Sequence, residues 1–130
     1  MLPVENRLSK VRDFNLLLKH GRWCNGKFLD LKMLNLAENK NYFPKQVSPE
    51  EFAAQLKIAF AVGTRISKSA VVRNRLRRQL REILRLRLAN GELRAGYYLL
   101  VLPKKDALKK NYAELKQELE LLLGRSSLAR

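Results

Sequence analysis

Arginines are the residues best suited to chemistry in this sequence, and one segment concentrates them. Ten basic residues stand against two acidic ones between Arg65 and Arg94, so this segment supplies +8 of a net charge of +15. Every cation from Arg73 to Arg87 is an arginine. Because a guanidinium offers a planar fork of donors that matches a phosphate, the segment is a candidate surface for binding nucleic acid.

Residues for protein-based hydrolysis are scarce. The chain has one histidine, His20, one cysteine, Cys24, and no carboxylates at metal-ligand spacing. We therefore expect no catalytic residue, no protein metal site and no disulfide partner, and we interpret Cys24 as an incidental thiol. No stretch approaches the roughly 18 apolar residues that span a bilayer, and no signal segment is recognisable, so a cytoplasmic protein with no membrane partner is expected.

A long helix is expected to display the arginines. Apolar residues recur with helical spacing through residues 64–88, and this pattern predicts one helix over that range. Its apolar stripe contains Val72, Leu76, Leu80 and Ile83. Like charges three and four residues apart repel by about 0.2–0.5 kcal/mol per pair, which an anionic partner would relieve; the alternative is a merely solvated face. The opposite face contains Asn74, Arg77, Arg78, Arg81 and Arg85, with Arg73 and Arg75 at its borders.

Shorter elements precede this helix. Ser9 and Gly21 bracket an amphipathic helix, with Ser9 as its cap, Gly21 in the left-handed conformation at its end, and one apolar face made of Val11, Phe14, Leu17 and Leu18. Asn25-Gly26 predicts a hairpin into a strand over 28–36. Alternation in that strand places Leu29, Leu31 and Met33 inward, and Phe28, Asp30 and Lys32 on the other face.

The remaining elements complete a single domain. Strands are predicted over 56–63 and 97–103, and a last helix is expected to begin at Asn111, with Glu114 in a capping box, and to end at Gly124. The fold class is therefore α+β, in the order α-β-β-β-α-β-α, with a mixed four-stranded sheet. We expect one RNA-binding domain over 1–124, a loop insertion near 38–55, and a short tail over 125–130.

The arginine segment also resembles a known signature. Lys68-Ser69-Ala70-Val71-Val72 followed by Arg73-Asn74-Arg75-Leu76-Arg77-Arg78-Gln79-Leu80-Arg81-Glu82 is similar to that of the bacterial ribonuclease P protein component. Asn6-Arg7-Leu8, Asp13-Phe14 and Lys19-His20-Gly21 extend the resemblance. It implies a ribosomal protein S5 domain 2-like fold with a left-handed β-α-β crossover, although such crossovers are right-handed in about 98% of cases.

The resemblance also implies a function. Members of that family assist a catalytic RNA that hydrolyses precursor tRNA to remove its 5′ leader, using Mg²⁺ bound mainly by the RNA. The chain would thus be the protein subunit of this endoribonuclease, with ribonuclease P RNA and precursor tRNA as partners. The implied contacts with the RNA subunit are Arg65, Lys68, Arg73, Asn74, Arg75, Arg77, Arg78, Arg81 and Arg85.

A cleft beside the first helix would bind the single-stranded leader through Phe14, Leu18, His20 and a strand position aligned with Leu31 or Lys32, of which we take Lys32. The family often has aromatic residues where Leu18 stands, and a hydrophobic or aromatic residue at the strand position aligned with Leu31 or Lys32, which predicts weaker stacking on leader bases. His20 is equally interpreted as a helix cap and Phe14 as a core residue, while Trp23 and Tyr97 are expected to pack in the hairpin or core.

Three other functions fit parts of the sequence. A ribosome-associated or general structural RNA-binding protein would share the charge and the fold class, but would not prefer leader-bearing tRNA over mature tRNA. A DNA-binding regulator would need base-reading side chains where this helix has arginine. A membrane-surface helix would need a wider apolar stripe with bulky aromatic residues.

Overall fold

A mixed four-stranded sheet organises the chain. The computed structural model describes residues 2–43 and 49–126. The strands are β1 (Arg22–Asn25), β2 (Leu29–Asn35), β3 (Leu56–Phe60) and β4 (Tyr97–Pro103), in the spatial order β1-β2-β4-β3. β2 is antiparallel to β1 and β4, whereas β3 and β4 are parallel and are joined through α3 (Ala70–Ala89). The predicted fold class is therefore confirmed; the hand of this crossover stays a prediction.

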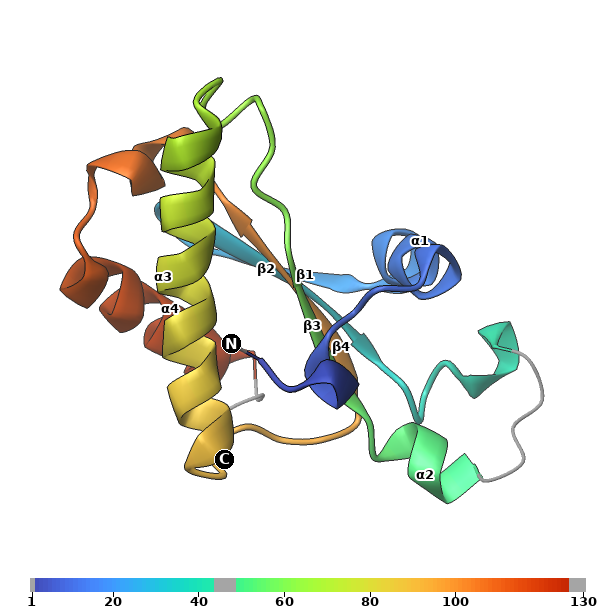
Figure 1. Cartoon of the computed structure of the whole chain (residues 1–130). Coiled ribbons are helices and arrows are strands. Elements are labelled where there is room, and N and C mark those ends of the chain that lie inside the picture. The colour runs from blue at the N-terminus through green and yellow to red at the C-terminus, as the bar shows by residue number, and fades with distance from the viewer. Residues whose placement is uncertain (1, 44–48, 127–130) are drawn as a thin grey trace.

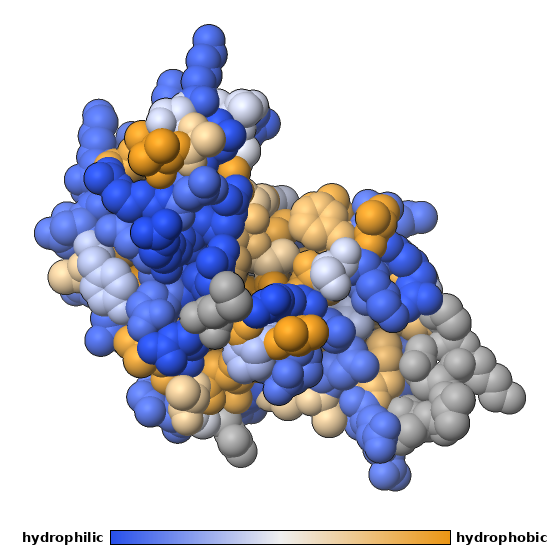
Figure 2. Space-filling view, viewed as in Figure 1, coloured by the Kyte–Doolittle hydropathy of each residue, from blue (hydrophilic) through white to orange (hydrophobic). Residues whose placement is uncertain are grey.

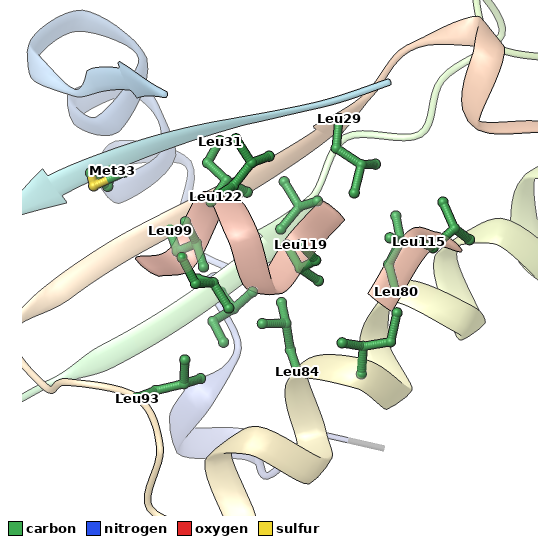
Figure 3. Close-up of a cluster of buried hydrophobic side chains, with 14 of the residues drawn as sticks. Leu29, Leu31, Met33, Leu80, Leu84, Leu93, Leu99, Leu115, Leu119 and Leu122 are labelled. Atoms are coloured by element: carbon green, nitrogen blue, oxygen red, sulfur yellow. The ribbon is translucent and has the colours of Figure 1, made fainter. Parts of the chain in front are cut away.

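Helices cover both faces of the sheet (Figure 1). α3 and α4 (Tyr112–Arg125) lie on one side, and α1 (Val11–His20) lies on the other. The first side holds the larger hydrophobic core, in which leucines of β2 and β4 meet leucines of α3 and α4 (Figure 3). The second, smaller core lies under α1. Its buried residues are Leu8, Leu17, Leu34, Leu36, Phe43, Phe52, Tyr98 and Leu100.

α3 is shorter than predicted but is built on the expected stripe. Leu76, Leu80 and Ile83 are buried, together with Leu84. The helix begins at Ala70 rather than near residue 64 because the Ser69 hydroxyl accepts a hydrogen bond from the Val72 N–H (3.3 Å), which makes Ser69 the N-cap. Residues 61–69 are instead a loop that leads from β3 to α3.

α1 differs from its prediction at both ends. It begins at Val11 after Lys10, so Ser9 is not its cap. Gly21 follows the helix with φ −70°, not in the left-handed conformation. It is needed for space, because a Cβ there would overlap the Leu17 carbonyl oxygen and lie 3.0 Å from Lys32 Cγ. Of the predicted apolar face, Leu17 is buried whereas Val11 and Leu18 are exposed.

The hairpin and the last helix form as predicted, with changes in detail. Asn25 pairs with Asp30, so the connection between β1 and β2 is longer than a two-residue Asn-Gly turn. Asn111 caps α4 in the predicted capping box with Glu114, but the helix continues past Gly124 to Arg125. β3 ends at Phe60, before the predicted residue 63.

The predicted insertion near 38–55 contains a 3-10 helix (Lys40–Tyr42) and α2 (Pro49–Ala53). Phe43 and Phe52 from its two ends pack against each other, with ring centroids 4.8 Å apart, and complete the second core. Residues 44–48 of the insertion and 127–130 of the predicted tail lie outside the described residues.

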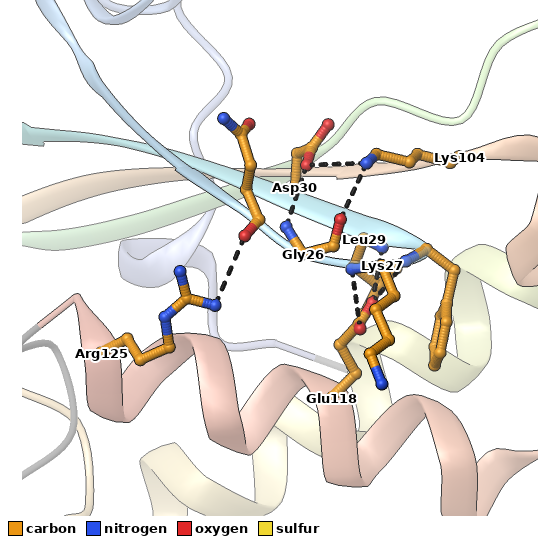
Figure 4. Close-up of polar contacts among 9 residues, drawn as sticks. Gly26, Lys27, Leu29, Asp30, Lys104, Glu118 and Arg125 are labelled. Carbon is orange, nitrogen blue, oxygen red and sulfur yellow. Dashed lines mark hydrogen bonds and ion pairs between the residues drawn. The ribbon is translucent and has the colours of Figure 1, made fainter.

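A buried carboxylate fixes the hairpin connection on α4 (Figure 4). Glu118 accepts backbone N–H bonds from Lys27 (3.0 Å), Phe28 (2.8 Å) and Leu29 (2.7 Å). Nearby, the Lys104 ammonium donates to the Gly26 carbonyl (2.8 Å) and pairs with Asp30 (3.6 Å). These contacts join the β1–β2 connection to α4 and to the end of β4.

Candidate RNA-binding surface

The beginning of α3 and the loop before it display free cationic side chains. Arg65, Lys68, Arg75 and Arg78 are exposed, as is Asn74. The surface over α3 is accordingly hydrophilic in Figure 2. An array of exposed guanidinium and ammonium groups along one helix favours a polyanion over an uncharged ligand.

Two of the predicted contacts also hold this loop in place. Arg73 donates from Nη1 to the Ser67 carbonyl (2.9 Å). Arg77 donates from Nη1 to Asn74 Oδ1 (2.7 Å) and from Nη2 to the Val62 carbonyl (3.0 Å). Because a guanidinium has five N–H donors, each side chain keeps donors for a phosphate after making these bonds.

The last two predicted arginines of α3 have different surroundings. Arg85 donates to both carboxylate oxygens of Glu82 (2.9 and 2.6 Å). This hydrogen-bonded pair lowers the pKa of Glu82 and raises the pKa of Arg85. Arg81 is half-buried and lines a 280 Å³ hollow with Leu2, Arg7, Ile58 and Phe60. Of the predicted arginine contacts within α3, Arg75 and Arg78 are therefore the exposed ones.

A cleft of about 890 Å³ adjoins this surface on the sheet. Trp23 of β1 and Leu102 of β4 contribute to its apolar lining. The loop that follows β3 forms another wall of the cleft. The cleft is also lined by four cationic side chains, which are Arg65, Arg77, Lys104 and Lys105. A cleft that combines apolar surface with several cations suits an unpaired nucleotide, which has a flat base and an anionic phosphate.

The four residues predicted to contact a leader lie around α1 and are not among those lining this cleft. Phe14 is half-buried and packs against the second core, while Leu18 is 40% exposed. The His20 ring stacks on Tyr42, with centroids 3.8 Å apart and an angle of 13° between the planes. Lys32 is buried, and its ammonium donates to the Leu18 carbonyl near the end of α1.

Sequence reasoning missed three residues of the cleft. Trp23 contacts Lys32 across the hairpin but is 52% exposed, so core packing is wrong for it, whereas Tyr97 does pack against the larger core. Lys104 and Lys105 directly follow the proline that ends β4. Their position directly after a strand could have identified them, because residues that follow a strand lie at the end of the sheet where ligands can reach them.

Within 2–43 and 49–126, no three histidine, cysteine, aspartate or glutamate side chains are gathered so that they could hold a metal ion. Cys24 is a free thiol, half-buried, with its sulfur 3.8 Å from the Leu122 carbonyl. Over the same ranges, no helix has the length and apolar character needed to cross a membrane.

Known proteins resemble the chain over nearly its whole length. Residues 2–127 match the family model described as Ribonuclease P. The ribonuclease P protein component of a Synechococcus species is 38% identical over 128 residues, covering 98% of this chain and 86% of the relative. That of Thermobifida fusca is 33% identical over 125 residues, covering 95% of this chain and 77% of the relative.

Solved structures agree on the fold. The Staphylococcus aureus RNase P protein superposes with a TM-score of 0.74 at 18% identity, covering 96% of this chain and 98% of that one. The Thermotoga maritima protein gives 0.66 at 23% identity, covering 92% and 96%. With the match over residues 2–127, these likenesses lead to one conclusion: the chain belongs to the ribonuclease P protein family, the protein components of an endoribonuclease ribonucleoprotein.

Proposed function

We propose that this chain binds the RNA subunit of ribonuclease P through the exposed cations at the beginning of α3, and holds the 5′ leader of precursor tRNA in the adjoining cleft. The observation that carries this proposal is the continuity of the two surfaces. Arg65 and Arg77 belong to the predicted RNA-binding set and also line the cleft. An RNA bound on α3 and a strand held in the cleft would therefore meet at these two residues.

Each part of this surface has a separate task. Lys68, Arg75 and Arg78 are exposed and free to neutralise phosphates of the folded RNA. Arg73 and Arg77 brace the loop over 61–69, so the cleft wall keeps its shape when RNA binds. Phe14, Leu18 and His20 would border the path of the leader beside α1, and Lys32 would act by fixing the end of that helix.

Hydrolysis of the precursor is assigned to the RNA subunit. Mg²⁺ would be bound mainly by that RNA, because the described part of this chain does not gather the ligands for such an ion. The protein would contribute binding energy and position, by keeping the leader in one conformation next to the scissile bond. These tasks would be carried out in the cytoplasm, where bacterial tRNA precursors are made.

Leader dependence distinguishes this function from that of a general structural RNA-binding protein. A holoenzyme reconstituted from this chain and its RNA subunit is expected to bind leader-bearing precursor more tightly than mature tRNA, and to lose that preference without the protein. The measurement is a pair of equilibrium titrations at fixed salt and Mg²⁺. Equal affinity for the two tRNAs, with the protein present, would instead indicate a structural role.

A further inference from the structure

Trp23 lies on the cleft side of the sheet, opposite a lysine. In the antiparallel pair of β1 and β2, Trp23 stands directly across from Lys32. Residues paired in this way project from the same face of a sheet, so the indole and the Lys32 side chain are neighbours. The Lys32 ammonium lies 4.7 Å from the centre of the indole, within the range of a cation–π contact.

Lys32 holds this indole from one side. Its side chain is 8% exposed, and its ammonium also donates to the Leu18 carbonyl. The lysine is thus fixed by α1 and by the ring that it contacts. An indole supported in this way keeps one orientation, which reduces the entropy lost when a flat ligand stacks on it.

The rest of the indole is open. Trp23 is 52% exposed and lines the 890 Å³ cleft, whose cations Arg65, Arg77 and Lys105 can bind phosphates. Lys104 also lines the cleft, where it pairs with the carboxylate of Asp30. Phe60, the other aromatic residue of the lining, is half-buried and packs against the larger core. Trp23 is therefore the exposed aromatic surface that the described part of the cleft offers to a base.

The positions named by the family resemblance do not offer an equivalent surface. Leu18 is aliphatic, Phe14 packs on the second core, and His20 stacks on Tyr42. Lys32 lies beneath the indole.

We propose that Trp23 is the base-stacking residue of this cleft and that it binds an unpaired base of the 5′ leader. This inference rests on the proposed function. Stacking of a base on an aromatic side chain tolerates any of the four bases. Trp23 is therefore expected to increase affinity for a leader without selecting its sequence.

Trp23 is also the only tryptophan of the chain, so its fluorescence reports on this one position. In the reconstituted holoenzyme, leader-bearing precursor is expected to quench this fluorescence, and mature tRNA is not. Trp23→Leu is expected to weaken binding of leader-bearing precursor by between about fivefold and about a hundredfold. Mature tRNA should bind the variant as it binds the wild type. Trp23→Phe should retain most of the affinity, because it keeps a flat ring.

Leu121→Ala is the matched control, since Leu121 is an exposed apolar residue of α4 that does not line this cleft. It should bind both tRNAs as the wild type does. Thermal unfolding of each variant checks that the fold is kept, and the wild-type fluorescence change needs no variant at all. If the wild type prefers leader-bearing precursor but Trp23→Leu keeps that preference, or if the wild-type fluorescence does not respond, this inference is overturned while the proposed function stands. If the wild type shows no preference, both fail.

Discussion

Arginines of α3 differ in the hydrogen bonds and ion pairs that they make with neighbouring residues. Arg73 and Arg77 each donate a hydrogen bond to a backbone carbonyl of the preceding loop. Arg85 forms a hydrogen-bonded ion pair with Glu82. Arg75 and Arg78 are exposed, and neither forms a salt bridge with an acidic side chain of the described residues. The sequence predicts all of them as one surface, but their energetic contributions to RNA binding should differ.

Replacement of Arg78 tests this difference against replacement of Arg85. Arg78→Ala should weaken binding of the RNA subunit and reduce the slope of log affinity against log salt by about 1, as expected for the loss of one phosphate contact. Arg85→Ala should change the slope less, because its charge is already paired with Glu82. Filter-binding or fluorescence titrations over a range of salt would give both slopes. Equal effects of the two substitutions would contradict the assignment.

Tyr98 provides a prediction about pH. Burial, and then the nearby negative charge of Asp13, raise the pKa of Tyr98 from 10 to about 12. The folded protein thus favours the neutral phenol, and the stability that this gives is complete below pH 10. This contribution to the free energy of unfolding should be lost as pH rises from 10 to about 12, because Tyr98 ionises at a lower pH in the unfolded chain than in the folded protein.

The absorbance of tyrosinate follows this ionisation. Of the four tyrosines, one should titrate near pH 12, and Tyr98→Phe should remove that step. The same substitution should flatten the fall of unfolding free energy over this pH range relative to the wild type. If the folded protein shows no tyrosine step near pH 12, the assignment of Tyr98 as a buried phenol is contradicted.

The elements are held in position by contacts between residues far apart in the chain. Glu118 of α4 binds the hairpin connection, and Lys32 of β2 binds the end of α1. Arg77 of α3 donates to the Val62 carbonyl in the loop after β3. Each contact satisfies backbone groups that lie outside the regular hydrogen bonding of the sheet or a helix. The orientation of α1, α3 and α4 on the sheet follows from these contacts together with the two cores.

Glu118→Ala should lower the free energy of unfolding by about 3 kcal/mol. It would leave three backbone N–H groups of the hairpin connection without their charged acceptor. Glu118→Gln should cost less, because an amide oxygen still accepts. Glu114→Ala, which removes only one half of the capping box, should cost about 1 kcal/mol. Urea denaturation measures all three, and similar losses for Glu118→Ala and Glu114→Ala would show that the buried carboxylate has no special role.

Local patterns predicted much of the fold. The hairpin, β4 and the capping box of α4 depend on residues within a few positions of each other, and all three form. The role of Glu118 could not be predicted, because its partners are about 90 positions away. Periodicity identified Leu17 as a core residue but could not show that Val11 and Leu18, on the same predicted face, are exposed. Trp23 was missed because its exposure depends on how much of that sheet face α1 covers.

The whole molecule brings two binding surfaces together. The parallel crossover from β3 through α3 to β4 places the beginning of the arginine helix beside the loop that forms a wall of the cleft. A net charge of +15 attracts RNA to the whole protein, while Arg65 and Arg77 connect the helix surface to the cleft. In the proposed function, this arrangement would let one small protein bind a folded RNA and an unpaired strand at adjoining sites.

Reconstitution at low Mg²⁺ tests the central claim most directly. Ribonuclease P RNA is incubated with leader-bearing precursor tRNA at a Mg²⁺ concentration at which the RNA alone cleaves slowly. Addition of this chain should restore cleavage at the correct 5′ end, and the Arg75→Ala, Arg78→Ala double variant should restore much less at the same concentration. No restoration by the wild-type chain with its cognate RNA, or full restoration by the double variant, would contradict the account.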